Sequence, residues 1–342
     1  MTPSHTVVIS ERLGRIGPDE RNLEAAGATV RSEPLWSRDA LLANAADATV
    51  LLVGSVEPVT GAVLAELPQC VAVVRRGVGH DNVDVEAATE LGVVVANVPD
   101  ASVEEVSDHA IALLFALERR IVALNAAVHE GVWNRDPAGI VAVRAGMRRL
   151  ASLTLGVIGF GRIGRATVRK ALPTYARVLV HDPLVTAAEI EAAGAVAAGL
   201  DEVYAGADHL SLHASLGSGS RKMIDEAAVA QMRPGAMLVN TARGGMLDEA
   251  AVVAAIRAGH LGGLGLDVTE HEPIGSDDPL LTTEGVLLTA HSGAFSTTSV
   301  AELRQRALGA VDDILHGRVP AAVVNRDVLA SPALRAKELT ND

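Results

Sequence analysis

Aromatic residues, cysteine and long apolar runs are scarce in this sequence. Aromatic residues make up 2% of the 342 residues although apolar residues make up 49%, so any core must be built from alanine, valine, leucine and isoleucine. The single cysteine, Cys70, excludes an intramolecular disulfide and suits a reducing cytoplasm. The chain is too long for one ordinary domain and fits two.

Basic residues are also in short supply. The chain has 29 Lys and Arg against 42 Asp and Glu, a net charge of −13, which argues against nucleic acid and anionic membranes as partners. The N-terminus lacks the basic start and apolar core of a signal peptide. The most membrane-like stretch, 110–117, is too short to span a bilayer and predicts a buried helix. Because the net charge is negative, an anionic substrate would need a local cationic pocket. We expect no metal site.

Short β-branched runs alternate with Ala-rich helical segments, a pattern typical of parallel sheets covered by helices. The first hundred residues form a doubly wound unit in this interpretation, and a second series of strands follows. The expected strands are 6–10, 28–32, 49–53, 71–75 and 93–97, then 155–158, 177–181, 209–213, 236–240, 263–267 and 286–289.

Helical patterns set the expected domain boundaries. One long helix is predicted from Ala101 to about Glu130, and a last amphipathic helix over 298–316 has no strand of its own. We expect that last helix to return to the first domain. This gives a discontinuous domain of 1–100 plus 296–342 and an inserted domain of 101–295, with a loosely held tail beyond Asn325.

A glycine-rich turn is the strongest local signal. Residues 157–164 read Val-Ile-Gly-Phe-Gly-Arg-Ile-Gly, and Asp182 closes the next apolar run. Gly159 permits the turn from strand to helix, Gly161 lets a pyrophosphate approach the backbone, and Gly164 lets the helix pack closely. The helix presents free N–H groups to phosphates, and an acid at this distance can accept hydrogen bonds from the ribose hydroxyls. The pattern predicts a dinucleotide site.

Three further polar side chains follow strands of the same series. Arg243 lies between an apolar strand and two glycines, where a guanidinium can grip a carboxylate; an interdomain salt bridge is the alternative. Glu272 and His291 follow the next two strands, and a carboxylate beside a histidine is typical of a proton donor. A loop histidine with no such role is the alternative for His291.

A second glycine-rich turn follows the fourth strand of the first domain, in the run from Arg75 to Asn82. Consecutive backbone N–H groups in such a turn can form an anion nest. We predict that this turn, with Arg76, binds a substrate carboxylate at an interdomain cleft. As a bare pattern, a glycine turn of this kind often serves only to reverse the chain.

Together these motifs closely resemble the D-2-hydroxyacid dehydrogenase family, from about residue 5 to Asn325. The stretches 97–100 and 104–109 are most similar to the branch that includes relatives of the C-terminal-binding proteins. The resemblance implies a Rossmann NAD-binding domain inserted into a discontinuous flavodoxin-like substrate domain, and a homodimer. It places Arg243, Glu272 and His291 on the catalytic arginine, glutamate and histidine, and Val78 and Gly79 on the backbone loop that binds the substrate carboxylate.

The resemblance also implies a set of positions around NAD. We predict that Arg162 and Ile163 lie at the pyrophosphate turn with Gly159, Gly161 and Gly164. The other positions predicted to line the cofactor are Val106, Asp182, His213, Ala214, Thr241, Ala242, Asp267 and His291. The chain departs from the family pattern at Ala290, where proline is common, and at Thr269, where an aromatic residue is common. These departures bear on the size and shape of the substrate pocket.

The expected function is reversible hydride transfer between NAD and C2 of a small 2-hydroxy or 2-oxo acid. His291 would be the acid/base, Glu272 its partner, and Arg243 would orient the substrate. Asp182 favours NAD, because it would repel a 2′-phosphate. One alternative is an NAD-responsive, corepressor-like scaffold with a vestigial site, and another is oxidation of an anion such as phosphite or formate.

Overall fold

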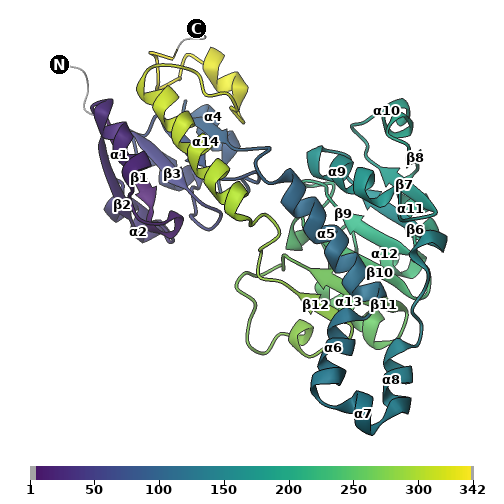
Figure 1. Cartoon of the computed structure of the whole chain (residues 1–342). Coiled ribbons are helices and arrows are strands. Elements are labelled where there is room, and N and C mark those ends of the chain that lie inside the picture. The colour runs from purple at the N-terminus through teal and green to yellow at the C-terminus, as the bar shows by residue number, and fades with distance from the viewer. Residues whose placement is uncertain (1–4, 340–342) are drawn as a thin grey trace. The chain divides into compact units, whose positions relative to one another are not determined.

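The computed structural model describes residues 5–339, and the chain forms two compact units (Figure 1). Unit 1 comprises Met1–Ser102 and Ser296–Asp342, and unit 2 comprises Val103–Phe295. Each unit contains one all-parallel sheet with helices on both faces. The predicted fold class, two doubly wound parallel sheets, is confirmed.

The sheet of unit 1 has the strand order β2-β1-β3-β4-β5. Its strands are nearly continuous runs of apolar residues, as expected where both faces are covered. Their bounds are β1 (Thr6–Ser10), β2 (Thr29–Glu33), β3 (Val50–Val53), β4 (Ala72–Arg75) and β5 (Val94–Asn97). The chain runs from β1 outward to β2 and then crosses back to β3 on the other side of β1, so the β1/β3 boundary is a topological switch point.

Two groups of helices cover this sheet. α1 (Pro18–Ala25) and α14 (Thr297–Leu315) bury Leu23 and Val311 against one face. The other face is covered by α2 (Arg38–Asn44), α3 (Gly61–Ala65) and α4 (Val85–Glu90). Side chains of Ser37, Thr60 and Asp84 accept backbone N–H groups at the starts of α2, α3 and α4, which fixes where these helices begin.

The C-terminal segment is packed rather than loosely held, so that prediction is wrong for the described residues. It forms η5 (Arg326–Ala330), and Arg335 Nη1 then donates to the carbonyls of Leu67 and Cys70 at 2.8 and 3.0 Å. Ala336 is fully buried. A polar composition could not reveal this packing, because the anchoring acceptors are backbone carbonyls far away in the sequence.

The sheet of unit 2 has the order β12-β11-β10-β9-β6-β7-β8. Six of these strands were predicted. The seventh, β8, has two residues at the sheet edge, too few to produce a periodic signal. The bounds are β6 (Thr154–Ile158), β7 (Arg177–His181), β8 (Val196–Ala197), β9 (His209–Leu212), β10 (Ala236–Asn240), β11 (Leu261–Leu266) and β12 (Val286–Leu288).

The faces of this sheet are also covered by helices. α5 (Val103–Glu118) and α9 (Arg162–Ala171) pack on one face, and α11 (Leu200–Gly206), α12 (Glu226–Gln231) and α13 (Glu249–Arg257) on the other. α10 (Ala187–Ala192) contacts the edge strand β8. The remaining short helices are η1 (Glu11–Leu13), η2 (Leu150–Ser152), η3 (Gly244–Met246) and η4 (Pro279–Leu281).

The single long helix predicted from Ala101 to about Glu130 is instead two helices. α5 ends at Glu118, and Arg120 adopts a left-handed conformation (φ 51°) before α6 (Ile121–His129). α7 (Val132–Arg135) and α8 (Pro137–Arg144) follow, and the three helices form a group beyond the end of α5 (Figure 1). Apolar spacing continues across the break and hides it. Within residues 5–339, no helix is both long and apolar enough to cross a membrane.

Candidate active site

The residues predicted to bind the cofactor lie mainly at the carboxyl edge of the unit 2 sheet. Parallel strands place their carboxyl ends at one edge, and β6 and β9 flank the point where the strand order reverses. The predicted residues that follow strands at this edge are Gly159, Asp182, His213, Ala214, Thr241, Ala242, Arg243, Asp267 and His291. Val106 is buried on α5, which covers one face of the same sheet.

Two glycines of the turn after β6 are required by packing. Gly159 has φ +96°, and a Cβ there would lie 2.5 Å from the backbone nitrogen of Ala214. A Cβ on Gly164 would lie 2.0 Å from the carbonyl oxygen of Gly159. The turn and the start of α9 can therefore approach β9 only with glycine at both positions.

Gly161 is different, because a Cβ at this position would meet no atom within 4 Å. Nothing in the protein itself requires glycine there, whereas a phosphate lying against the backbone would. Gly161 is the N-cap of α9 and supplies no side chain to its first N–H groups; Arg162 is exposed and Ile163 half-buried just after it. At the end of β10, two strands from β6, Thr241 Oγ1 is buried without a hydrogen-bond partner among the described residues. These features fit the phosphates of a dinucleotide.

Asp182 lies directly after β7 and is oriented by backbone groups. Its Oδ2 accepts the N–H of Phe160 in the glycine turn at 2.6 Å, and its Oδ1 accepts the N–H of Leu184 at 2.8 Å. Each carboxylate oxygen can accept a second hydrogen bond. The geometry therefore leaves acceptor capacity for ribose hydroxyls beside the turn.

His213 follows β9 on the other side of the reversal point. Burial lowers the pKa of its imidazole to about 4, so the ring is neutral near pH 7. One ring nitrogen, Nε2, lies 2.9 Å from the hydroxyl of Ser211. A neutral ring in this position lines the edge without adding charge.

His291 and Glu272 form a direct pair. His291 Nδ1 lies 2.7 Å from Glu272 Oε2, and both side chains are 39% exposed. Although burial alone would raise the pKa of Glu272, the hydrogen bond with His291, the positive charge of a protonated ring and the N–H of Thr269 lower it. Among the described residues, no group hydrogen-bonds to His291 Nε2, so this atom can exchange a proton with a bound molecule.

The backbone of His291 is held in an unusual conformation by Asp267. His291 has φ +50°, and its N–H donates to the carbonyl of Asp267 at 2.8 Å. The carboxylate of Asp267, 4% exposed, accepts the N–H groups of Ser292 and Gly293, each at 2.8 Å. A left-handed conformation is costly for a residue other than glycine and persists only where its surroundings fix it. Asp267 thus fixes the turn, and its contact with the cofactor stays a prediction.

Two further residues join this arrangement and were not predicted from the sequence. The hydroxyl of Thr289 donates to Asp267 Oδ1 at 2.6 Å, and His109 Nε2 of α5 lies 2.9 Å from that hydroxyl. His109 Nε2 is also 3.5 Å from Asp267 Oδ1. His109 belongs to the stretch 104–109 that carries the family resemblance, but nothing in its spacing indicates a partner 180 residues away.

Arg243 lies half-buried at the end of β10, where Nη1 donates to the carbonyl of Ala242 at 2.6 Å. The next residue, Gly244, packs so closely that a Cβ would lie 2.0 Å from the carbonyl carbon of Thr269. The turn carrying Arg243 therefore lies directly against the loop carrying Glu272. The structure brings these two segments together.

The predicted substrate loop lies in unit 1, after β4. The amide N–H groups of Val78 and Gly79 have no acceptor among the described residues, whereas Asn97 Nδ2 holds the carbonyl of Val78 at 2.7 Å. Such a loop, with its carbonyl anchored and its N–H groups free, can bind an anion. Arg76 precedes it and is half-buried.

The chain is similar to known proteins over most of its length. Residues 111–293 match the model of the family described as D-isomer specific 2-hydroxyacid dehydrogenase, NAD binding domain. The D-3-phosphoglycerate dehydrogenase of Mycobacterium tuberculosis is 40% identical over 270 residues, 79% of this chain and 49% of that protein. The chain thus spans about half the length of the curated relatives it matches.

Solved structures show the same architecture. A glyoxylate reductase from Paecilomyes thermophila superposes with a TM-score of 0.84 and 26% identity, over 95% of this chain and 100% of that chain. An NADPH-dependent glyoxylate/hydroxypyruvate reductase from Sinorhizobium meliloti, in complex with NADP and malonate, gives a TM-score of 0.82 and 25% identity over 94% and 96%.

Proposed function

The chain belongs to the D-isomer-specific 2-hydroxyacid dehydrogenase family, with an NAD-binding domain in unit 2, and we propose that it interconverts a small D-2-hydroxy acid and its 2-oxo acid. The observation that carries the proposal is the pair of His291 and Glu272 at the carboxyl edge of an NAD-binding sheet. A half-exposed imidazole with one nitrogen on a carboxylate and the other available is suited to proton transfer near neutral pH.

The proposed roles follow from that pair. NAD, when bound, supplies or accepts the hydride at C2. In the reducing direction, protonated His291 donates from Nε2 to the carbonyl oxygen of the substrate. Glu272 accepts from Nδ1, fixes the tautomer and stabilises the charged ring, and its lowered pKa keeps it ionised.

Anion recognition is assigned to two segments. We assign Arg243 to the carboxylate and carbonyl of the substrate, because a guanidinium offers paired donors to such groups. In unit 1 the free amides of Val78 and Gly79 are assigned to the carboxylate, with Arg76 beside them. A local cationic site of this kind is needed in a chain of net charge −13.

Asp182 supports NAD as the preferred coenzyme. Its carboxylate is fixed beside the glycine turn by two backbone N–H groups, so it cannot readily turn away from a ligand. A 2′-phosphate placed there would face a fixed negative charge and would lose the ribose hydrogen bond. NADH is expected to be used more efficiently than NADPH.

We also propose that the chain forms a homodimer through α6–α8. Five apolar side chains of this segment are 45–65% exposed: Ile121, Val122, Val128, Trp133 and Val141. Residues 121–144 contain two arginines and two acidic residues, so net charge does not oppose packing of this segment against a second copy. Sedimentation should show a dimer that Trp133→Glu dissociates, whereas Leu184→Glu, at an exposed leucine outside this segment, should not.

We also propose that the chain is located in a reducing compartment such as the cytoplasm. The one cysteine, Cys70, is a buried free thiol, and burial raises its pKa to about 12. Such a thiol is inert and is consistent with a chain that does not depend on disulfides.

The test is a panel of 2-oxo acids assayed by NADH and NADPH oxidation. Glyoxylate, hydroxypyruvate, pyruvate and 3-phosphohydroxypyruvate cover the kinds of substrate for which relatives are named. Turnover of at least one acid, with NADH preferred and His291→Ala nearly inactive, is expected. Tight NADH binding without turnover of any acid would favour the corepressor-like scaffold, and the absence of NADH binding would contradict both.

A further inference from the structure

The loop that carries Glu272 has few links to the rest of unit 2. It comprises residues 268–277, between β11 and η4. In the described part of the chain, only one backbone group of this loop hydrogen-bonds to another segment, and that group is the N–H of Glu270. Its acceptor is Oε1 of Glu249, at 2.6 Å. The place of Glu272, two residues further on, therefore depends in part on an acid that the proposed chemistry does not use.

Glu249 is the first residue of α13, but its position at the start of a helix does not explain this contact. Acids are common in the first turn of a helix because they favour the positive end of its dipole. Glu226 has the equivalent place in α12, directly after an aspartate N-cap. It is exposed, however, and its side chain forms no hydrogen bond or ion pair within residues 5–339. Glu249 is instead half-buried and reaches another segment.

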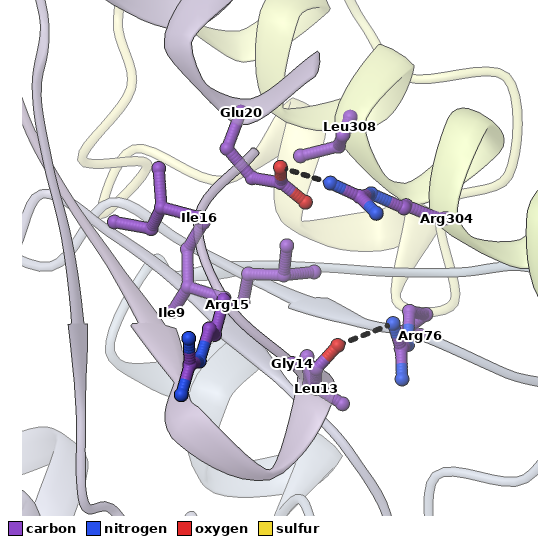
Figure 2. Close-up of a pocket in the computed structure, with 10 residues that line it drawn as sticks. Ile9, Leu13, Gly14, Arg15, Ile16, Glu20, Arg76, Arg304 and Leu308 are labelled. Atoms are coloured by element: carbon purple, nitrogen blue, oxygen red, sulfur yellow. Dashed lines mark hydrogen bonds and ion pairs between the residues drawn. The ribbon is translucent and has the colours of Figure 1, made fainter. Parts of the chain in front are cut away.

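A second acid in the first turn of a helix, Glu20 of α1, shows the more usual arrangement. Its carboxylate accepts the N–H of Gly17, at the start of its own helix, at 2.8 Å. It is also hydrogen-bonded to Arg304, which matches its charge (Figure 2). Glu249 differs in both respects, because its hydrogen bond leaves the helix and no basic side chain among the described residues forms an ion pair with it.

The surroundings of Glu249 disfavour a charged carboxylate. Burial raises its pKa; the N–H of Glu270 opposes this rise, and the negative charges of Asp278 and Glu270 add to it. The nearby cation is engaged elsewhere, since Lys222 Nζ lies 3.6 Å from Asp248 and 3.7 Å from Glu270. An acid kept in such a place beside an active site indicates that its carboxylate has a function.

We propose that Glu249 is a positioning residue for the pair of Glu272 and His291. By holding the N–H of Glu270, it fixes the loop in which Glu272 faces His291. In this loop the N–H of Thr269 donates to Glu272 Oε1 at 3.2 Å, which leaves Oε2 for His291 at 2.7 Å. Glu249 thus acts through Glu272 rather than on the substrate. The inference rests on the proposed function and adds to it the group that orients the acid/base pair.

The first experiment measures kcat and both KM values with NADH and the best 2-oxo acid. Glu249→Ala should lower kcat about 10-fold, at the low end for a hydrogen bond to a charged group, and leave the KM for NADH nearly unchanged. Glu249→Gln keeps an acceptor oxygen and should recover most of the rate. An unchanged kcat in Glu249→Ala, or no recovery in Glu249→Gln, would overturn the inference.

Matched variants control for helix charge and for folding. Glu226→Ala removes the same charge from the equivalent place on α12 and should leave kcat unchanged. Glu249→Asp keeps the charge at the start of α13 but shortens the side chain by one carbon. It should lower kcat as well, and it serves if Glu249→Ala does not fold. A similar loss in Glu226→Ala would show that helix charge, and not the contact with the loop, is responsible.

A double-mutant cycle tests whether Glu249 acts through Glu272. Glu272→Ala removes the carboxylate that the loop presents to His291. Adding Glu249→Ala to this variant should therefore lower kcat by less than about 2-fold more, because the two residues act in one chain of contacts. A second loss of about 10-fold would mean that they act independently, and the inference would fail.

NMR titration of the side-chain carboxyl carbon of Glu272 gives a readout that does not depend on turnover. Its signal is identified by its absence in Glu272→Ala. Although burial alone would raise the pKa of Glu272, the hydrogen bond with His291 lowers it. In Glu249→Ala this pKa should rise towards its ordinary value of 4.5, and in Glu249→Gln it should stay low.

The direction of this change separates the possible causes. Loss of the negative charge of Glu249 alone would lower the pKa of Glu272, and a general loss of stability would leave it unchanged. A rise is therefore specific to a displaced pair. If no 2-oxo acid is turned over but the rise is measured, the dehydrogenase proposal fails and the positioning role stands. A pKa that stays low or falls in Glu249→Ala would overturn the positioning role whatever the activity.

Discussion

Two of the histidine–carboxylate pairs in unit 2 lie at opposite ends of its parallel strands, one at the carboxyl ends and one at the amino ends. At the carboxyl edge, His291 Nδ1 lies 2.7 Å from Glu272, and both side chains are 39% exposed. At the amino edge, His209, the first residue of β9, lies 2.9 Å from Glu118, and both side chains are fully buried. The two pairs have the same chemistry and almost the same length.

The two pairs differ in what else they contact. Both ring nitrogens of His209 are occupied, Nε2 by Glu118 and Nδ1 by the hydroxyl of Tyr175 at 2.8 Å. Arg148 binds the Glu118 carboxylate through Nη2 at 2.8 Å and its own backbone N–H at 2.5 Å. The buried pair has no atom left for a substrate, whereas His291 keeps Nε2 available. Both histidines are paired with a carboxylate. What distinguishes the candidate catalytic histidine is that one of its ring nitrogens has no hydrogen-bond partner among the described residues, whereas both ring nitrogens of the structural histidine are occupied.

The largest effect is expected for the variant His291→Gln, which tests the catalytic role of the exposed pair. The expected loss in kcat is about 10²- to 10⁴-fold, the usual contribution of a general acid–base residue. Thermal unfolding should change little, because the pair is half-exposed. NADH oxidation with the best 2-oxo acid and a melting curve on the same sample provide both readouts. A near-normal rate would remove His291 from the mechanism.

The opposite result is expected at the amino edge. Glu118→Ala should cost about 3–5 kcal/mol of folding free energy, because it leaves the fully buried His209 without its carboxylate partner. Urea unfolding of unit 2 measures the loss. Glu272→Ala is the matched control at the other edge, and it should reduce kcat but cost less than about 1 kcal/mol of stability. Equal losses of stability would show that burial does not distinguish the pairs.

The stability that the Glu118 pair contributes should depend on pH. Burial alone would raise the pKa of Glu118, but hydrogen bonds from His209 and Arg148 lower it from 4.5 to about 2. A lowered carboxyl pKa stabilises the fold above pH 4.5, and this contribution is lost as the pH falls from 4.5 towards 2. The stability gap between the wild type and Glu118→Gln should therefore be full at pH 6 and shrink below pH 4.5. A gap that grows in acid would contradict the lowered pKa.

The carboxyl-edge arrangement could be foreseen because its signals are local. The strands end in recognisable residues, and parallel strands bring their carboxyl ends to one edge, so Asp182 and the segments of Arg243, Glu272 and His291 could be placed together. The family and its fold are confirmed by the match over residues 111–293 and by the solved structures. The catalytic and cofactor roles of the single residues stay predictions.

The amino-edge network could not be foreseen, because its partners are distant in sequence. Glu118 and His209 are 91 residues apart, and Arg148 reaches Glu118 across 30. The same network explains the wrongly predicted long helix, since α5 ends where Glu118 turns into the interior and Arg120 adopts a left-handed conformation. The apolar period continues through this point, so only the tertiary contacts reveal the break.

The smallest expected effect concerns how the carboxyl-edge pair is held. His109 of α5 contacts Thr289, whose hydroxyl in turn binds the carboxylate that fixes the His291 turn. His109→Ala should lower kcat about 2- to 10-fold, in line with the net value of one hydrogen bond, and leave the KM for NADH nearly unchanged. Steady-state kinetics with both substrates varied separates the two constants.

His109→Gln, which can still reach Thr289, should recover most of the loss. If the KM for NADH rises while kcat holds, His109 acts on the coenzyme rather than on the turn. The two pairs would then differ in their dependence on α5. The exposed pair would be held by Asp267 and Thr289 without this helix, whereas the buried pair includes Glu118 of the same helix.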